Sequence, residues 1–312
     1  MKLPEFQKIT QDKTTTPPWA HLMEKGQFIS YGPTFQSKIY FDLFDEYVYP
    51  SKETGDIRYY VYDPIKHGQP KDKTYPVLMW LHGMNNALDG IKCIFCCGAE
   101  QYASPKYQEA MDGAYIIVPL ANEERLPDMS IKGAWSTFKD DSEDSIYSEA
   151  LKGIYDKVCD EHKENIEKRF VMGASSGGYM TWQMLKHYPD YFAGAIPISA
   201  GYLPEEEMLN QLEQTKTQVI VAHGKLDELA LFEYTIEPNR EKYELMENVI
   251  CYFPQWVQNG DKGISSICYG FEMGQHCMIN QIQANLMFDD GSAMDERFPN
   301  GITGWIRSVC DK

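Results

Sequence analysis

The fold of this chain is decided by one stretch of sequence, RFVMGASSGGYMTW, at residues 169–182. An apolar run typical of a buried strand leads into GASSG at residues 173–177, and an amphipathic helical pattern continues to His187. GASSG matches G-x-S-x-G, which has physical meaning when a strand precedes it and a helix follows. Such a sharp turn strains the backbone of its serine and requires small neighbours. The sequence therefore predicts Ser175 as a nucleophile at a strand-to-helix turn.

On both sides of this stretch, short apolar runs alternate with longer helical patterns, the order that builds a parallel sheet covered by helices on both faces. The predicted strands are Arg58–Asp63, Tyr75–Leu81, Ala114–Pro119, Arg169–Gly173, Gly194–Ile198, Gln218–Ala222 and Val249–Phe253, with Lys38–Tyr49 as an antiparallel edge. One predicted helix begins near Ser145, which is its expected N-cap. The other predicted helices cover Ser176–His187, Pro204–Leu212, Pro238–Met246, His276–Leu286 and Gly301–Val309. We therefore expect an α/β fold with a mostly parallel sheet of about eight strands.

The domain organisation expected from the sequence is simple. No repeat, low-complexity segment or convincing linker divides the chain. We expect an irregular N-terminal arm at residues 1–37 and a single catalytic domain at residues 38–312.

Composition and charge exclude several classes of partner. The chain has 312 residues, of which 43% are hydrophobic, so a sizeable core is expected. Its net charge of −17 would repel nucleic acid and an anionic membrane surface. No run approaches the ~18 apolar residues of a membrane span, and residues 1–20 lack the apolar stretch of a signal peptide. A cytoplasmic protein is expected, unless a secretory leader was removed.

The eight cysteines are scattered through a chain too large to need a disulfide framework. Cys159, Cys251 and Cys310 fall in predicted core elements and are expected to be buried, reduced thiols. The cluster at residues 93–97, CIFCC, contains one C-x-x-C, but no second pair or spaced histidine pair completes a zinc site. We expect no metal and no cofactor, and either a local disulfide or plain packing at the cluster.

The nucleophile needs a base, and in hydrolases with this turn the acid and the histidine follow the serine in that order. Three histidines follow Ser175. His187 ends the helix that begins at the serine and points away, and His223 leaves no acid-bearing strand between itself and Ser175. His276, on a loop after the last strands, is therefore the predicted base.

The third member should be a carboxylate that accepts the Nδ1–H of the histidine. Asp227 fits best, because it follows the predicted strand Gln218–Ala222 after a short turn. Glu228 is the competing acid, and Asp261 is a weaker one.

Acyl transfer also needs donors for the oxyanion. The backbone N–H of Ser176, directly after the serine, is one predicted donor. The second is the N–H of Met84, in the loop His82-Gly83-Met84 that follows the strand Tyr75–Leu81. Gly83 lets the backbone come close, and His82 is expected to bond the loop backbone.

These motifs carry a family resemblance over roughly residues 57–309. The run VLMWLHG at residues 77–83 resembles the L-H-G block of α/β-hydrolases. GASSGGYMTW at residues 173–182, followed by FAGAIPISAG at residues 192–201, is similar to a narrower branch. This branch contains esterase D, feruloyl esterases, polyhydroxybutyrate depolymerases and members described as predicted peptidases. The resemblance implies the α/β-hydrolase fold, the triad Ser175, Asp227 and His276, and the Met84 and Ser176 amides as oxyanion hole.

The sequence departs from this family where specificity is set. Ser176 stands where many relatives carry a larger residue, and segments 85–107 and 253–273 have no clear counterpart. Asn85, Trp135 and Trp256 are the candidates for substrate contact, with core packing as the alternative for the two tryptophans.

Three functions remain from the sequence. The first is a serine esterase that cleaves a small-molecule or short oligomeric carboxylic ester through an acyl-enzyme. The second is a serine peptidase that cuts short peptides with the same triad. The third, a non-catalytic binding protein, would normally have lost a triad residue, and all three positions are filled here. Assembly into a homo-oligomer stays open.

Overall fold

The central element of the fold is a sheet of eight strands. The computed structural model describes residues 38–90, 99–140, 143–255, 257, 274–288 and 290–312. Within them the strand order is β1-β2-β4-β3-β7-β8-β9-β10, parallel from β4 to β10 and antiparallel at β1 and β2. The strands are β1 (Asp45–Tyr49), β2 (Ile57–Tyr62), β3 (Tyr75–Leu81), β4 (Tyr115–Pro119), β7 (Ile166–Ala174), β8 (Gly194–Ile198), β9 (Gln218–Ala222) and β10 (Val249–Tyr252). The predicted α/β fold and its mostly parallel sheet are confirmed.

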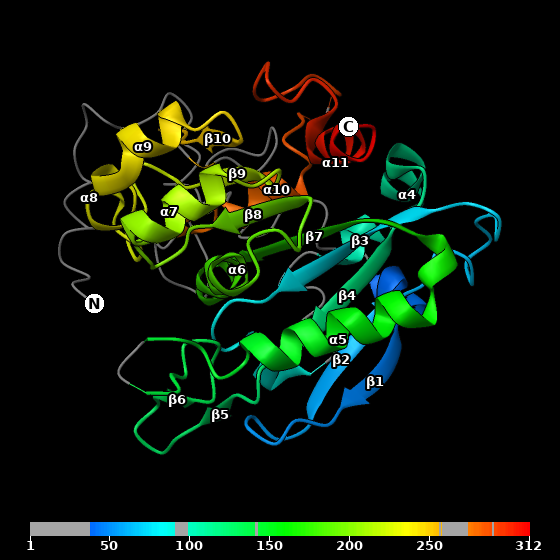
Figure 1. The fold of residues 1–312 in the computed structure, drawn as a ribbon, viewed down its shortest axis with the longest axis horizontal. Helices are drawn as coiled ribbons and strands as arrows, with labels where there is room; N and C mark the ends of the chain where they lie inside the picture. Colours follow the sequence, from blue (N-terminus) through cyan, green and yellow to red (C-terminus); the bar gives the residue numbers. More distant parts are fainter. Residues whose placement is uncertain (1–37, 91–98, 141–142, 256, 258–273, 289) are drawn as a thin grey trace, which may run out of the picture.

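Helices cover both faces of this sheet (Figure 1). The helices that pack on one face are α5 (Ser148–Glu161), α6 (Ser176–His187), α7 (Glu206–Glu213) and α9 (Arg240–Leu245). The helices on the other face are α3 (Ala99–Tyr102), α4 (Pro105–Met111), α10 (Ile279–Gln283) and α11 (Gly301–Cys310). Smaller elements are α8 (Phe232–Thr235), the hairpin β5 (Glu124–Arg125) and β6 (Ile131–Lys132), and the 3₁₀ turns η3 (Lys38–Leu43), η4 (Asn86–Asp89), η5 (Lys163–Asn165), η6 (Glu237–Asn239) and η8 (Gly274–His276).

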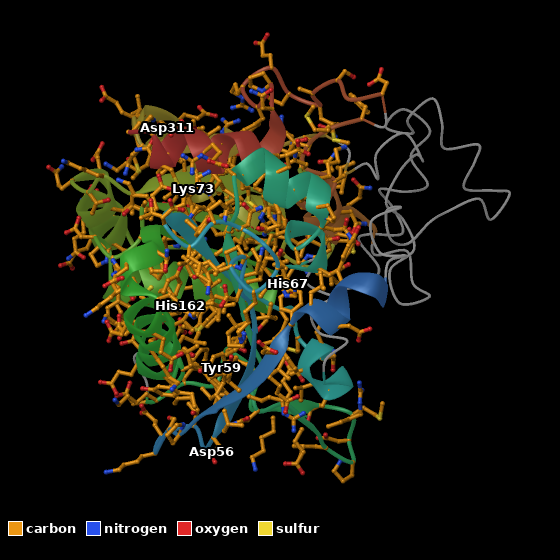
Figure 2. All side chains as sticks on the ribbon, turned by 90° about the vertical axis from the view of Figure 1, so that its right-hand side faces the viewer. Asp56, Tyr59, His67, Lys73, His162 and Asp311 are labelled. Carbon is orange, nitrogen blue, oxygen red and sulfur yellow. The ribbon has the colours of Figure 1, made fainter. Side chains whose placement is uncertain are left out.

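The two-sided cover explains why the central strands are continuously apolar. All seven residues of β3 are buried; Val77 and Met79 face one helical layer, and Leu78 and Trp80 face the other. Successive side chains of a strand point to opposite faces, so both sets must be apolar when both faces are covered. Figure 2 shows side chains filling these layers, and Tyr59 of β2, which is labelled there, is 1% exposed.

Several predicted boundaries are wrong, among them those of the edge strand, of helix α5 and of the segment that begins at His276. The first half of Lys38–Tyr49 is the turn η3, and only β1 forms the antiparallel edge. Helix α5 begins at Ser148 and not at Ser145, because the Ser145 hydroxyl donates to the Trp135 carbonyl (2.6 Å) and accepts the Tyr147 amide in a preceding turn (3.2 Å). The predicted helix His276–Leu286 is divided into η8 and α10.

Several sequence expectations concern other parts of the chain. Cys159, Cys251, Cys277 and Cys310 are free thiols; Cys159 and Cys310 are buried as expected, whereas Cys251 is only half-buried. The arm at residues 1–37 and the cluster at residues 93–97 lie outside the described residues, so the domain boundary at residue 38 stays a prediction. In the described part of the chain, no helix has the length and apolar character needed to cross a membrane.

Candidate active site

The predicted nucleophile lies in a strained turn between β7 and α6. Ser175 is the N-cap of α6, and its backbone has φ 57° and ψ −117°. Residues other than glycine rarely adopt a positive φ. The Ser175 amide donates to the Ile198 carbonyl of the neighbouring strand β8 at 2.8 Å. From Phe170 to Leu185, Ser175 is the only residue that is not buried. The turn therefore presents one serine to solvent from an otherwise buried segment.

Close backbone packing explains the glycines around this serine. A Cβ atom on Gly177 would lie 2.0 Å from the Leu81 carbonyl oxygen, at the end of β3. A Cβ atom on Gly173 would lie 2.6 Å from the Gly177 carbonyl oxygen. Neither contact is sterically allowed, so the turn and the end of β3 approach each other only because both positions lack side chains.

The predicted acid and base contact each other directly. Asp227 follows β9, and His276 lies in η8; the Nδ1 atom of His276 is 2.9 Å from both carboxylate oxygens of Asp227. Because an ionised carboxylate only accepts hydrogen bonds, Nδ1 carries the proton and Nε2 is left as an acceptor. The Asp227 side chain is fully buried and that of His276 is 13% exposed. This is the tautomer that a general base needs.

The loop after β9 holds Asp227 in place. The Asp227 carboxylate accepts the amides of Leu229 (2.9 Å) and Ala230 (2.8 Å). Burial by itself would raise the pKa of Asp227, but His276 opposes this and, with the hydrogen bonds, holds the pKa below its ordinary value. The carboxylate is therefore ionised at neutral pH.

His223 supports the same loop, a role that the sequence argument did not assign. Its Nε2 lies 2.7 Å from the Ala230 carbonyl, to which it must donate, and 3.4 Å from an Asp227 oxygen. Burial lowers the pKa of His223, so the ring is neutral. Its place at the end of β9, four residues before the acid, is the signal that could have identified it.

Glu228, the competing acid, makes no hydrogen bond to the imidazole ring of His276, whose Nδ1 atom lies on Asp227. It is 4% exposed, and among the described residues neither carboxylate oxygen has a hydrogen-bond partner. Burial, and next the negative charge of Asp227, raise the pKa of Glu228 to about 8. Asp261, the weaker alternative, lies outside the described residues.

The loop after β3 lies against the nucleophile turn. A Cβ atom on Gly83 would lie 3.8 Å from the Ser175 Cβ. His82 is fully buried; its Nδ1 donates to the Gly83 carbonyl at 2.7 Å and its Nε2 accepts the Ala121 amide at 3.0 Å. Burial lowers the pKa of His82 to about 4, so the ring is neutral and structural, as expected. Gly83, directly before Met84, thus lies against the nucleophile turn, and Ser176 follows the serine in α6; the Met84 and Ser176 amides stay the predicted oxyanion donors.

The three candidates for substrate contact have different surroundings. Trp135 is fully buried, donates from Nε1 to the His82 carbonyl at 3.0 Å and packs against Tyr147, so it supports the loop from within the core. Asn85 is half-buried in the loop that follows β3, and its backbone has φ 74°. Trp256 lies outside the described residues.

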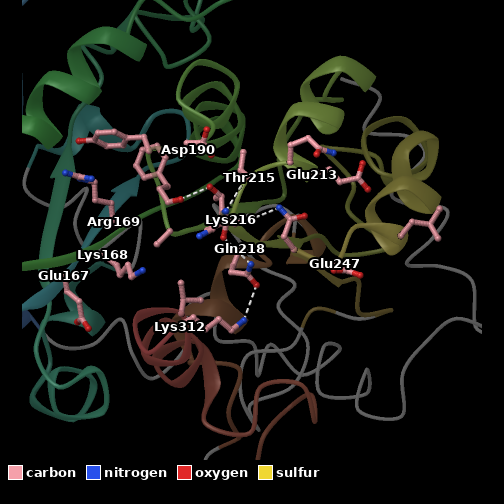
Figure 3. Close-up of a pocket in the computed structure, with 18 residues that line it drawn as sticks. Glu167, Lys168, Arg169, Asp190, Glu213, Thr215, Lys216, Gln218, Glu247 and Lys312 are labelled. Carbon is pink, nitrogen blue, oxygen red and sulfur yellow. Dashed lines mark hydrogen bonds between the residues drawn. The ribbon is translucent and has the colours of Figure 1, made fainter.

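A depression of about 1210 Å³ lies at the opposite edge of the sheet, at the amino ends of β7, β8 and β9 (Figure 3). Charges of both signs surround it, among them Lys168, Arg169, Glu213 and Glu247. The length of β7 separates it from Ser175, roughly 20 Å at about 3.3 Å per residue. It therefore has no part in the chemistry of the serine.

In the described part of the chain, no group of three or more acidic, histidine or cysteine side chains could hold a metal ion.

Comparison with solved structures agrees with this fold. A crystal structure of a thermostable esterase superposes with a TM-score of 0.58 at 22% identity, over 77% of this chain and 60% of that one. A structure described as FAE gives 0.50 at 13% identity over 80% of this chain and 90% of that one, and a ferulic acid esterase gives 0.42 at 18% over 67% and 88%. At these identities the likeness shows the fold, which is that of the α/β-hydrolases. This chain spans about 60% of the length of the thermostable esterase.

The family follows from the sequence itself. Residues 51–229, more than half of the chain, match the model of the family described as "Putative esterase". No curated protein matches the sequence. The chain belongs to this esterase family.

Proposed function

We propose that the chain hydrolyses a small-molecule or short oligomeric ester through an acyl-enzyme, with Ser175 as nucleophile, His276 as base and Asp227 as the orienting acid. One observation carries the proposal: the Nδ1 atom of His276 lies 2.9 Å from both oxygens of the buried Asp227 carboxylate. That contact commits Nε2 to accept a proton, and Ser175, which is the one residue of the segment 170–185 that is not buried, follows β7 at the same edge of the sheet.

Strand geometry supports the pairing of Ser175 with His276. Ser175 directly follows β7 and Asp227 follows β9, and these strands are separated only by β8. Neighbouring strands lie about 4.8 Å apart, so the two carboxyl ends are about 10 Å from each other. A histidine bonded to Asp227 spans most of that distance.

The proposed reaction has two steps. Nε2 of His276 takes the Ser175 hydroxyl proton as the oxygen attacks the ester carbonyl, and the resulting imidazolium returns the proton to the leaving alcohol. Water then hydrolyses the acyl-enzyme with the same histidine as base. Asp227 stabilises the imidazolium in both steps, and the amides of Met84 and Ser176 stabilise the oxyanion.

The test is labelling with a fluorophosphonate probe together with turnover of a short-chain p-nitrophenyl ester. We expect labelling at Ser175, and Ser175→Ala to abolish it and to reduce kcat by about 10⁴-fold or more. Ser292→Ala, at an exposed serine, is the matched control and should change neither.

Other outcomes separate the remaining functions. Faster turnover of aminoacyl amides than of aryl esters would favour a peptidase. Absence of labelling in folded protein would favour a binding protein and contradict the proposal.

A further inference from the structure

The loop that carries the Met84 amide is held by a carboxylate that no sequence motif marks. Glu123 lies four residues beyond β4, and its two oxygens accept the amides of Asn85 and Ala87, each at 3.1 Å. One side chain thus binds two backbone N–H groups on the far side of Met84.

The remaining hydrogen bonds of the loop fix the peptide bond between Gly83 and Met84. Its carbonyl oxygen accepts the Nδ1–H of His82 at 2.7 Å and the amide of Asn86 at 3.3 Å. In a trans peptide the N–H points opposite to the carbonyl. The Met84 N–H is therefore directed away from these partners, and among the described residues it has no acceptor of its own.

The segment from His82 to Ala87 is bonded at both ends to one neighbouring loop, residues 121–123. The Ala121 amide donates to Nε2 of His82 at 3.0 Å, and the Asn122 amide donates to the Tyr147 hydroxyl at 3.0 Å. Glu123 follows directly and reaches the other end of the oxyanion loop. The left-handed backbone of Asn85, with φ 74°, is held between these two attachments.

The position of Glu123 is costly for a carboxylate. Burial raises the pKa of Glu123 to about 7, although the two amides from Asn85 and Ala87 favour the ionised form. Its neighbour Glu124 is exposed, and its carboxylate lies 4.0 Å from the Nζ atom of Lys132. The two adjacent glutamates thus provide a matched comparison.

We infer that Glu123 is a positioning residue for the oxyanion hole, which it serves by fixing the loop that aims the Met84 amide at the substrate carbonyl. This rests on the proposed function. Glu123 does not touch substrate; it acts through the backbone of Asn85 and Ala87. A misplaced oxyanion donor lowers transition-state stabilisation and leaves ground-state binding largely intact.

The experiment compares Glu123→Gln and Glu123→Ala with Glu124→Gln and Glu124→Ala, using a p-nitrophenyl ester and active-site titration with a fluorophosphonate. Gln keeps one acceptor oxygen but puts an NH₂ group against the second amide, whereas Ala removes both acceptors. We expect kcat per titrated site to fall about 10-fold for Gln and about 100-fold for Ala, with KM within about threefold of wild type. The Glu124 variants should behave as wild type.

A tetrahedral inhibitor gives a second readout. A boronic acid binds the serine as a tetrahedral adduct whose oxygen occupies the oxyanion hole, so its inhibition constant should rise by the same factor as kcat falls. A purely structural Glu123 would reduce the amount of titratable enzyme and the melting temperature, with kcat per site unchanged. That result would overturn the inference.

The outcomes also separate the inference from the proposed function. Wild-type protein that neither labels nor turns over would overturn the proposed function. Wild-type turnover with unchanged kcat in both Glu123 variants would overturn the inference alone. If the Ala variant fails to fold, the Gln variant decides by the same criteria.

Discussion

At the carboxyl ends of β7 and β9 charged side chains are buried, whereas at the amino ends of the same strands they face solvent. Asp227 is fully buried beside His276, and Ser175 has a strained backbone. At the other edge, the ion pair of Arg307 with Glu167 has both side chains more than 20% exposed. The same sheet therefore has one edge with perturbed charges and strain, and another whose charges stay solvated.

The polar groups that are buried at the amino edge bind backbone instead. The Thr217 hydroxyl lies 2.7 Å from the carbonyls of both Pro189 and Phe192, and Asn248 donates to the carbonyls of Leu212 and Thr217. These contacts join loops to strand beginnings and present no reactive group. Strain and buried charge mark the chemical edge, whereas at the structural edge the Thr217 hydroxyl and the Asn248 Nδ2 amide bond to backbone carbonyls.

The largest effect is expected from Asp227→Asn. The amide NH₂ of Asn would face the Nδ1–H of His276, so the ring would adopt the other tautomer, in which Nε2 carries the proton and no longer accepts one. We expect kcat for a p-nitrophenyl ester to fall by about 10⁴-fold with the fold retained. Asp190→Asn, at an exposed site on the amino edge, is the control with the same chemical change. A fall of less than about tenfold would contradict the assigned acid.

Glu228→Gln tests the cost of an unpartnered buried carboxylate. With its pKa raised to about 8, Glu228 keeps its proton in the folded protein, whereas the unfolded chain releases it near the ordinary pKa. The stability that the protonated Glu228 side chain contributes is therefore fully present below the pKa that this side chain has in the unfolded chain. That stability is lost as the pH rises to about 8.

Thermal melts from pH 5 to pH 8 measure this effect. We expect the melting temperature of Glu228→Gln to increase relative to wild type across this window, by a few degrees at pH 8. A difference that does not change with pH would contradict the protonated carboxyl. Glu233→Gln, at an exposed position in α8, serves as the control.

The smallest effect is expected from Thr217→Val at the amino edge. The change conserves volume but removes a buried hydroxyl that contacts two carbonyls, at a cost of about 1–2 kcal/mol. We expect the melting temperature to fall by about 2–5 °C and kcat to stay unchanged. A fall in kcat of more than about threefold at full folding would show that the two edges are coupled, contrary to the comparison above.

The elements that sequence predicted well are those with strong local patterns. α6 has the predicted bounds, and β3, β8 and β9 do as well, because continuous apolar runs flanked by turn residues leave little freedom of register. Helix α5 starts late because Ser145 bonds Trp135, which is distant along the chain. Helices α3 and α8 have four residues each, too few for a helical period to be visible.

The sequence of this protein by itself determined the turn around Ser175 and the order of Asp227 and His276, because a strained turn admits few residues and the chain offers few histidines. It left Asp227 and Glu228 as competitors, and only the tertiary structure decided between them, by placing the His276 ring on Asp227. The same holds for Glu123. It acts through backbone groups of another segment, and such contacts leave no pattern in the order of residues, since they exist only after the strands have brought those segments together.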